Sequence, residues 1–290
     1  MKCPACHSKK FEFWKKCSSQ HIQNDEYQLY QCKDCLHVQA IGDNDNFILS
    51  KIYSEPFFST SAQNDSLNSP ASKNAINRAK RLNTLYSPKS TLDIGAGIGL
   101  FVSAMGKYCP VIGVEYSKHA VEKAGKLANN VIQLDFTKSL TEIETVLDNR
   151  SFDLITLWDV SSCFEDQSDI FVKIFSLCSN ESNVVVTVPI YDSAAARVMG
   201  KFWPFWIPPV NQHYYTSESI VSIASIAGFK NIQISKRWKY VGLDFLLQKF
   251  LRTIGFAANW KIIGLFSAIK LPINTFDIAE VHMEKSLVRK

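Results

Sequence analysis

The chain has 290 residues, 46% of them hydrophobic and 12% aromatic, which is enough for one large core plus a small module. Its 32 basic and 27 acidic residues leave a formal charge of +5 without any block of five like charges, which argues against a nucleic-acid partner. Neither a secretory signal nor a run of eighteen apolar residues is found, so we expect a cytoplasmic protein with reduced cysteines.

Two Cys-x-x-Cys pairs stand near the start of the chain, in CPACH (3–7) and CKDC (32–35). The first also has the spacing of a c-type haem attachment site, but such haem is attached outside the cytoplasm. Four thiolates on a short, turn-rich segment are typical of a structural Zn²⁺ site without an open position for chemistry. We therefore predict a zinc ribbon over 1–42. The predicted ligands are Cys3, Cys6, Cys32 and Cys35.

The next segment, 43–69, is rich in Asn, Asp and Ser and is predicted to be a linker that can order over a ligand as a lid. Ser69 followed by Pro70 is a good helix start. Apolar residues then recur at helical spacing as far as Tyr86, which predicts one helix.

From residue 90 the pattern alternates between strand and helix, which indicates a parallel sheet covered by helices on both faces. The expected helices cover 99–108, the stretch from about 120 to 127, 168–178 and 216–228. The expected strands cover 90–95, 110–115, 130–136, 152–160, 183–190, 231–238 and 278–286.

The sequence LDIGAGIGLF (92–101) lies where the first strand hands over to a helix, so its glycines allow a ligand to approach the backbone. Glu115 follows Asp93 by 22 residues and ends the second strand, where an acid can bind both hydroxyls of a ribose. Asp135, at the end of the third strand, is a candidate for an adenine amino group. Solvated strand ends are the alternative for both acids.

These motifs resemble those of class I S-adenosylmethionine-dependent methyltransferases, over about 70–238. The resemblance implies an α/β fold with a doubly wound, mostly parallel, seven-stranded Rossmann-like sheet whose last strand is antiparallel. It also implies that Asp93 and Gly95 approach the methionine end, that Glu115 binds the ribose, and that Asp135 with its neighbour flanks the adenine. The full predicted set for S-adenosylmethionine is Asp93, Gly95, Gly97, Glu115, Tyr116, Asp135, Phe136 and Trp158.

Four functions stay open at this point. An NAD-dependent oxidoreductase is disfavoured, because its fingerprint wants glycine where Leu100 stands. An RNA methyltransferase lacks the expected basic stripe. A non-catalytic module that only binds S-adenosylmethionine is the third alternative. We favour methyl transfer to a small molecule or a saccharide or glycolipid intermediate, because the ribbon and HYYTSESI (213–220) are similar to bacterial enzymes that methylate sugar and cell-envelope precursors.

Methyl transfer to a hydroxyl or an acidic carbon needs a base as well as positioning. Enzymes of this family often carry Glu-His after WDV, whereas this chain has Ser162 and Cys163 there. His213 is the best remaining candidate, with a structural role in anchoring its loop as the alternative. Asp159 and Tyr214 are predicted to orient the acceptor.

A segment at 240–276 interrupts the core, which is predicted to span 70–239 and to finish with a last strand in 277–290. We expect this insertion to be helical and apolar, with Lys249, Arg252, Lys261 and Lys270 dividing its apolar runs. Packing against the core or a second subunit is our preferred role, which leaves a homo-oligomer open. Contact with the inner face of the membrane, or with a lipid tail, is the alternative.

Overall fold

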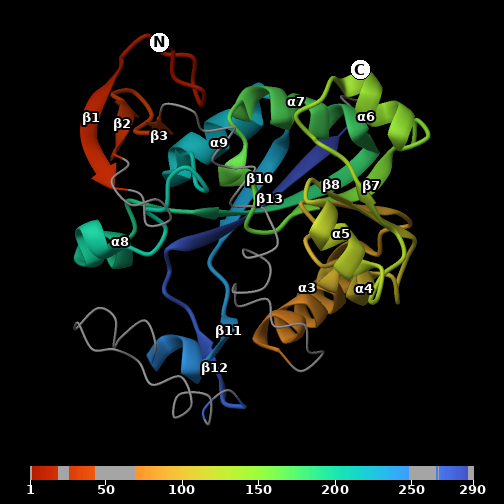
Figure 1. Ribbon diagram of the computed structural model, residues 1–290. Helices are drawn as coiled ribbons and strands as arrows, with labels where there is room; N and C mark the ends of the chain where they lie inside the picture. Colours follow the sequence, from red (N-terminus) through yellow and green to blue (C-terminus); the bar gives the residue numbers. More distant parts are fainter. Residues whose placement is uncertain (1, 19–25, 43–68, 248–265, 267, 287–290) are drawn as a thin grey trace.

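The computed structural model describes residues 2–18, 26–42, 69–247, 266 and 268–286, and its central feature is a seven-stranded sheet (Figure 1). The order of the strands is β10-β13-β8-β7-β4-β5-β6. Their bounds are β4 Thr91–Ile94, β5 Val111–Glu115, β6 Val131–Gln133, β7 Phe152–Leu157, β8 Cys178–Pro189, β10 Lys230–Ser235 and β13 Ile278–Ser286.

Strands β4 to β8 are parallel, whereas β13 runs antiparallel to both β8 and β10. The predicted fold class, including the antiparallel last strand, is confirmed. Because β4 lies between β5 and β7, the strand order reverses there, and this is where open α/β sheets bind ligands at the carboxyl ends of their strands.

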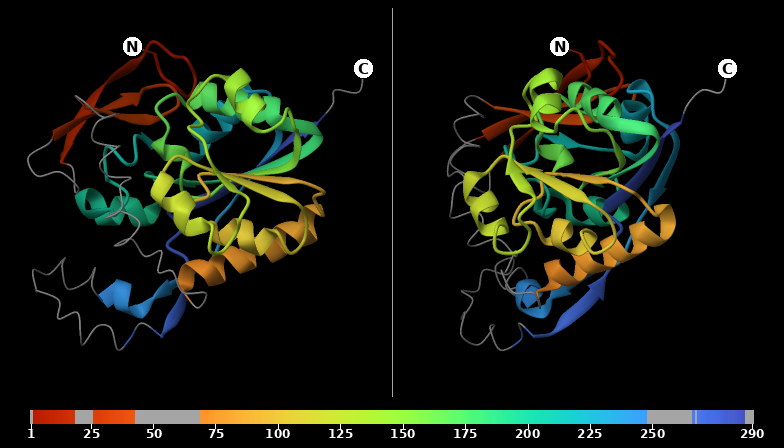
Figure 2. Two further views of the ribbon diagram at one scale, coloured as in Figure 1. Left: turned by 45° about the vertical axis from the view of Figure 1, so that its right-hand side comes forward. Right: turned by 90° about the vertical axis from the view of Figure 1, so that its right-hand side faces the viewer.

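Helices cover both faces of the sheet, as two views at right angles show (Figures 1 and 2). One face is covered by α3 Pro70–Tyr86, α4 Leu100–Met105 and α5 Lys118–Ala124, whose apolar residues form one core with β5, β6, β7 and β8. The other face is covered by α6 Leu140–Val146, α7 Gln167–Leu177 and α9 Ser217–Ile226. The sheet is therefore buried between two helical layers, which explains its near-continuous apolar strands.

Helix α3 begins where the sequence predicts. The Ser69 hydroxyl accepts a hydrogen bond from the Ser72 backbone at 3.1 Å, and proline occupies the first helical position. Ala75, Ala79 and Leu82 bury its apolar face, and the helix packs most heavily on α4. A partly exposed polar stripe that includes Arg78 and Arg81 flanks this apolar face.

The N-terminal segment forms a second sheet, β1-β2-β3-β9, with bounds β1 Phe11–Ser18, β2 Glu26–Cys32, β3 Val38–Ile41 and β9 His213–Tyr214. Its fourth strand, β9, comes from the α/β core rather than from the first 42 residues. Further hydrogen bonds tie the ribbon to the core, among them Ser168 to the Pro4 carbonyl (2.9 Å) and Ser222 to the Ala5 carbonyl (3.1 Å). The ribbon is therefore fused to the core at its edge.

The insertion begins and ends in strands: β11 Lys239–Gly242 pairs with β12 Lys270–Ile273. This ladder was not anticipated, and the predicted apolar helical face beyond residue 247 lies almost entirely outside the described residues, as does the predicted linker at 43–68. Short elements complete the fold: η1 Ser161–Cys163, α8 Ala194–Met199 and η2 Gly200–Phe202. Within the described part of the chain, no helix has the length and apolar character needed to span a membrane.

Candidate functional site

The turn between β4 and α4 exposes its backbone to the carboxyl edge of the sheet. Gly95, Gly97 and Gly99 have φ angles of 73°, 55° and 79°, which side chains rarely adopt. A Cβ atom at Gly95 would lie 2.7 Å from the Val160 side chain, so glycine is required there for space as well as for conformation. The predicted Gly95 and Gly97 thus stand at a tight turn that requires glycine.

Asp93 is the penultimate residue of β4, two positions before Gly95, and is almost fully buried. Its Oδ1 accepts a hydrogen bond of 2.6 Å from the hydroxyl of Thr156, the residue opposite it on β7. Burial raises the pKa of Asp93 to about 7, although Thr156 and the nearby Arg78 pull it down. A cationic ligand group placed here would be stabilised by the ionised carboxylate.

Glu115 ends the neighbouring strand β5, and its carboxylate reaches the glycine turn. Oε2 accepts from the Gly97 amide at 2.8 Å, and Oε1 accepts from the Ser117 amide at 2.9 Å. Burial raises the pKa of Glu115, whereas these amide hydrogen bonds lower it. A carboxylate has about four acceptor sites, so it retains capacity for the hydroxyls of a ribose.

Beside Glu115 lies a cavity of about 530 Å³. Two predicted cofactor residues, Tyr116 and Asp135, line it, and Tyr116 is half exposed. Asp135 Oδ1 is held by the amide and hydroxyl of Thr137 (2.9 and 2.7 Å). Phe136, in contrast, is buried in the core, with its ring 6.3 Å from that of Phe164.

Trp158 and Asp159 follow the end of β7, on the other side of the glycine turn. The Trp158 indole N–H is buried with no acceptor among the described residues, and the Arg78 guanidinium stacks 4.2 Å from its ring centroid. Asp159 has a φ of 59° and a 57% exposed side chain, which binds Thr187 at 3.0 Å and Arg78 at 3.4 Å. Partial burial opposes its charge, but Arg78 and Lys239 outweigh this effect and lower the pKa of Asp159.

A second cavity, of about 280 Å³, opens between α3, the β11–β12 ladder and the start of β13. Thr187, the hydrogen-bond partner of Asp159, lines it, so the cavity adjoins the end of β7. Its polar lining includes Asn74, Asn77, Arg78, Arg81, Arg237, Lys239, Asn274, Thr275 and Glu280. We call it the α3–β11 cavity.

His213 and Tyr214 lie on β9, at the seam between the ribbon and the core. His213 is fully buried, with its Nδ1 2.9 Å from His37 Nε2 and its Nε2 2.9 Å from the Glu165 carbonyl oxygen. Burial lowers its pKa to about 4. Tyr214 is buried against Trp206, with the ring centroids 4.4 Å apart. The structure therefore groups these two residues with the ribbon seam and Asp159 with the glycine turn.

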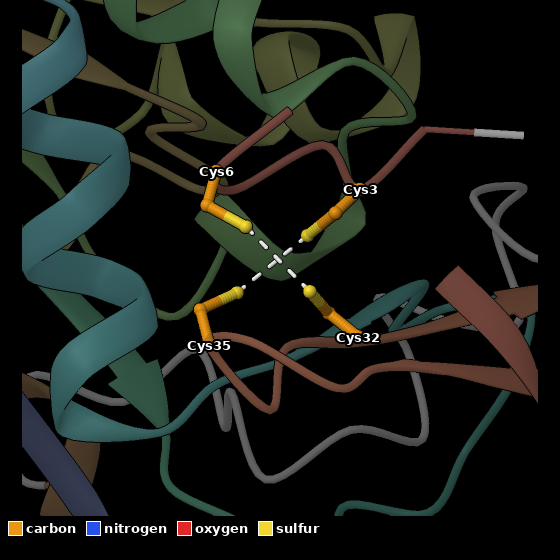
Figure 3. Close-up of side chains that lie close together, drawn as sticks. All are labelled: Cys3, Cys6, Cys32 and Cys35. Carbon is orange, nitrogen blue, oxygen red and sulfur yellow. Dashed lines mark hydrogen bonds between the residues drawn. The ribbon is translucent and has the colours of Figure 1, made fainter. Parts of the chain in front are cut away.

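The four predicted metal ligands converge, with their sulfurs pointing to a common centre (Figure 3). The Sγ atoms of Cys3 and Cys35 are 3.6 Å apart, those of Cys6 and Cys32 are 3.5 Å apart, and all four lie within 4.8 Å of one another. A tetrahedral Zn²⁺ with bonds of about 2.3 Å holds its sulfurs about 3.8 Å apart. Contact with Cys35 lowers the pKa of Cys3 to about 5, which favours the thiolate. The cluster fits a structural Zn²⁺.

Comparison with known families decides the class of the protein. The family model described as "Methyltransferase domain" matches residues 71–234, more than half of the chain. The chain belongs to this methyltransferase family. No curated protein matches it. Together with the fold, this match shows a class I S-adenosylmethionine-dependent methyltransferase that carries an N-terminal four-cysteine cluster.

Solved structures agree in fold. A methyltransferase from Archaeoglobus fulgidus superposes with a TM-score of 0.51 and 17% identity, covering 83% of this chain and all of the other. The plantazolicin methyltransferase BpumL, in complex with S-adenosylhomocysteine, gives 0.52 and 15% over 82% and 94%. Magnesium protoporphyrin IX methyltransferase from Synechocystis gives 0.52 and 13% over 83% and 100%. At these identities only the fold is shared.

The residues present fit the cofactor of this family. The glycine turn, the carboxylate of Glu115 and the indole of Trp158 all lie at the carboxyl ends of neighbouring strands. The buried Trp158 N–H has no acceptor among the described residues, so it can donate a hydrogen bond to the cofactor. Sequence reasoning missed Thr156 and Arg78. Thr156 is revealed only by the register of β4 against β7, whereas Arg78 belongs to a polar stripe of α3 that flanks the buried Ala75 and Ala79.

Proposed function

We propose that this methyltransferase transfers a methyl group from S-adenosylmethionine to a small molecule or a saccharide intermediate. The observation that carries the proposal is the α3–β11 cavity, which adjoins Asp159 and Trp158 at the carboxyl edge of the sheet. Its volume of about 280 Å³ suits part of a small acceptor rather than a folded macromolecule. The modest net charge likewise gives no support to an RNA acceptor.

The cofactor supplies a methyl group on a sulfonium, and the residues of the chain supply position. We propose that Glu115 holds the ribose hydroxyls, that Tyr116 and Asp135 contact the adenine from the larger cavity, and that Asp93 faces the methionine end. The backbone at Gly95 and Gly97 then lies against the cofactor. Alignment of this kind is the main source of rate in a direct group transfer.

Asp159 is the residue we propose to orient the acceptor. Its left-handed backbone is held by hydrogen bonds with Thr187, so that its carboxylate stays exposed at the cavity mouth. Because its pKa is lowered, it accepts hydrogen bonds well but is a weak base near neutral pH. Ser162 and Cys163 stand where many family members have Glu-His. His213 as the base, with Tyr214 as an orienting group, therefore remains a prediction.

The burial of His213 favours the anchoring alternative. A base must reach its proton within about 3 Å, and both ring nitrogens of His213 already have partners in the seam. In methyl transfer to a hydroxyl, water or a group of the acceptor itself would then have to accept the proton.

Two measurements test the proposal. Calorimetry should show binding of S-adenosylmethionine and S-adenosylhomocysteine but not of NADH, with Glu115→Ala weakening it about 10- to 100-fold by loss of two hydrogen bonds to the ribose. Glu122→Ala, on the exposed face of α5, is the matched control. Transfer of a radiolabelled methyl group into the low-molecular-weight fraction of a cell extract is the expected activity. Label in RNA or protein instead would overturn the proposed acceptor class.

A further inference from the structure

The lining of the α3–β11 cavity is strongly basic. Arg78 and Arg81 project from consecutive turns of α3, and Arg237 and Lys239 come from the chain that enters β11. Cations gathered from two distant segments face one space of about 280 Å³. Such a concentration needs anions, because like charges in one cavity repel each other.

Two carboxylates of the protein neutralise only part of this positive charge. Glu280, 4% exposed, binds Arg81 Nη2 at 2.6 Å and lies 3.6 Å from Arg237 Nε, while Asp159 lies 3.4 Å from Arg78. Burial opposes the charge of Glu280, but His282 and Arg81 lower its pKa, so it is ionised. Lys239 makes no ion pair with any residue in the described ranges. Four cations against two carboxylates leave an excess of two positive charges.

One donor of a residue that lines this cavity lacks an acceptor. The Arg81 Nη1 atom is buried and has no hydrogen-bond partner among the residues that the structure describes. Buried guanidinium donors are normally satisfied, since a charged group left without its hydrogen bond loses its hydration and gains nothing in return. A ligand oxygen could accept the hydrogen bond that the Arg81 guanidinium does not make within the described residues.

The cavity walls are fixed before a ligand binds. The Asn74 side chain makes two hydrogen bonds with the Tyr240 backbone, donating at 2.9 Å and accepting at 2.8 Å, which joins α3 to β11. Asn274 donates to the Lys236 carbonyl at 3.2 Å and holds the opposite wall. Cations on a rigid frame lose little freedom when an anion binds.

We propose that the α3–β11 cavity binds a phosphate or diphosphate group of the methyl acceptor, held by Arg81, Arg237 and Lys239. Guanidinium groups bind phosphate oxygens in a fork, and the lysine adds a point charge. The excess of two positive charges matches a dianion. This inference rests on the proposed function, because it takes the cavity as part of the acceptor site.

The rest of the acceptor extends out of the cavity, which is slightly smaller than the range of about 300–1,000 Å³ typical of small-molecule sites. Two features at its margins suit the uncharged part. Trp238 lines the cavity with 68% of its surface exposed, and Asp159 offers a hydrogen-bond acceptor toward the glycine turn. An anchored phosphate thus places a neighbouring polar group beside the predicted methyl donor.

Arg78 is excluded from the test because it has a second possible ligand. It stacks on Trp158 and acts on the charge of Asp93, so it stands nearest to the predicted methionine end and its carboxylate. Lys239 is the sharper probe: it lines the cavity and makes no ion pair with a described residue.

The experiment is calorimetric titration of the zinc-loaded protein, saturated with S-adenosylhomocysteine, with pyrophosphate at fixed ionic strength. We expect binding that Lys239→Glu weakens at least about tenfold, because a repelling charge replaces an attracting one. Lys126→Glu changes the net charge equally on an exposed surface away from both cavities and should leave pyrophosphate binding intact. Arg237→Gln should weaken it by a smaller factor.

The outcomes separate the two proposals. Intact binding of S-adenosylhomocysteine together with no pyrophosphate binding, or with equal binding by Lys239→Glu, overturns the phosphate site alone. If the unaltered protein does not bind S-adenosylhomocysteine at all, the proposed function is overturned. Two further titrations identify the source of the phosphate: tighter binding of a nucleoside diphosphate than of pyrophosphate points to a nucleotide-linked acceptor. Binding to phosphatidylglycerol vesicles that Lys239→Glu abolishes points to a lipid phosphate.

Discussion

His37 Nε2 and His213 Nδ1 lie 2.9 Å apart in the interior of the protein, and both side chains are fully buried. The second nitrogen of His213 faces the Glu165 carbonyl oxygen, so it carries the proton, and Nδ1 accepts the proton of His37 Nε2. The pair links β3 of the ribbon to β9 of the core. Two neutral imidazoles thus join the metal-binding module to the catalytic domain.

We predict that this link contributes to stability more than to chemistry. His37→Ala and His213→Ala should each lower the free energy of unfolding by about 2–4 kcal/mol, through a cavity and an unsatisfied polar partner. A double-mutant cycle in urea should give a coupling of about 1 kcal/mol or more. His119→Ala, in α5, is the control histidine change. Additive effects of the two substitutions would contradict the link.

A further substitution at position 213 distinguishes an anchor from a base. A base at position 213 gives kcat/KM an acid limb, which His213→Asn would remove. We expect the limb to be unchanged, because burial holds the pKa of His213 at about 4 and its two nitrogens are occupied. If His213→Asn removed the acid limb of the kcat/KM profile without changing stability, His213 would be the base.

The four-cysteine cluster is predicted to hold one Zn²⁺ per chain and to stabilise the ribbon. Chelation, or Cys32→Ser, should remove the metal and lower the free energy of unfolding by several kcal/mol, because the short N-terminal module has too little apolar surface to fold alone. Cys17→Ser, outside the cluster, is the matched control. Metal content by mass spectrometry and urea unfolding are the measurements. Full stability after complete zinc loss would contradict this prediction.

Much of the fold and of the cofactor edge could be predicted from the sequence, because each signal is local. Helix α3 is delimited by its Ser69 cap and apolar period, and the glycine turn requires positive φ. The features that could not be predicted depend on long-range contacts. Strand β9, for example, joins the ribbon sheet across more than 170 residues. The basic cavity likewise assembles from α3 and β11, and its arginines look like a solvated helix face when read along the chain.

Gly95→Ala is predicted to be far more damaging than Gly200→Ala. Both glycines have positive φ, at 73° and 53°, so an alanine strains the backbone at either position. Only at Gly95 does the new Cβ meet a side chain, at 2.7 Å from Val160, whereas nothing lies within 4 Å at Gly200. We expect loss of S-adenosylhomocysteine binding for Gly95→Ala alone, measured by calorimetry. Partial rescue by Val160→Ala would confirm the steric cause, and equal effects at the two glycines would contradict it.

Cofactor affinity is predicted to rise with pH up to about 7 and then to level off. Burial raises the pKa of Asp93 to about 7, and we expect its ionised form to face the ammonium group of the cofactor. Below that pH the carboxyl is protonated, and the Kd for S-adenosylhomocysteine should rise about tenfold per pH unit. The unliganded protein should behave oppositely: its folded state keeps a proton that the unfolded state loses above about pH 4. Its stability should therefore fall between about pH 4 and 7.

Thr156 provides the test that assigns this pH dependence to Asp93. Its hydroxyl donates to Asp93 Oδ1 at 2.6 Å and lowers the pKa of the acid, so Thr156→Val should move the midpoint of the affinity curve to higher pH. Asp93→Asn should bind weakly with a flat profile, since amide nitrogen and oxygen do not titrate. Calorimetry between pH 5.5 and 8.5 measures all three proteins. A midpoint that Thr156→Val leaves in place would assign the titration to another group, and Glu115, whose pKa burial also raises, would be the first to examine.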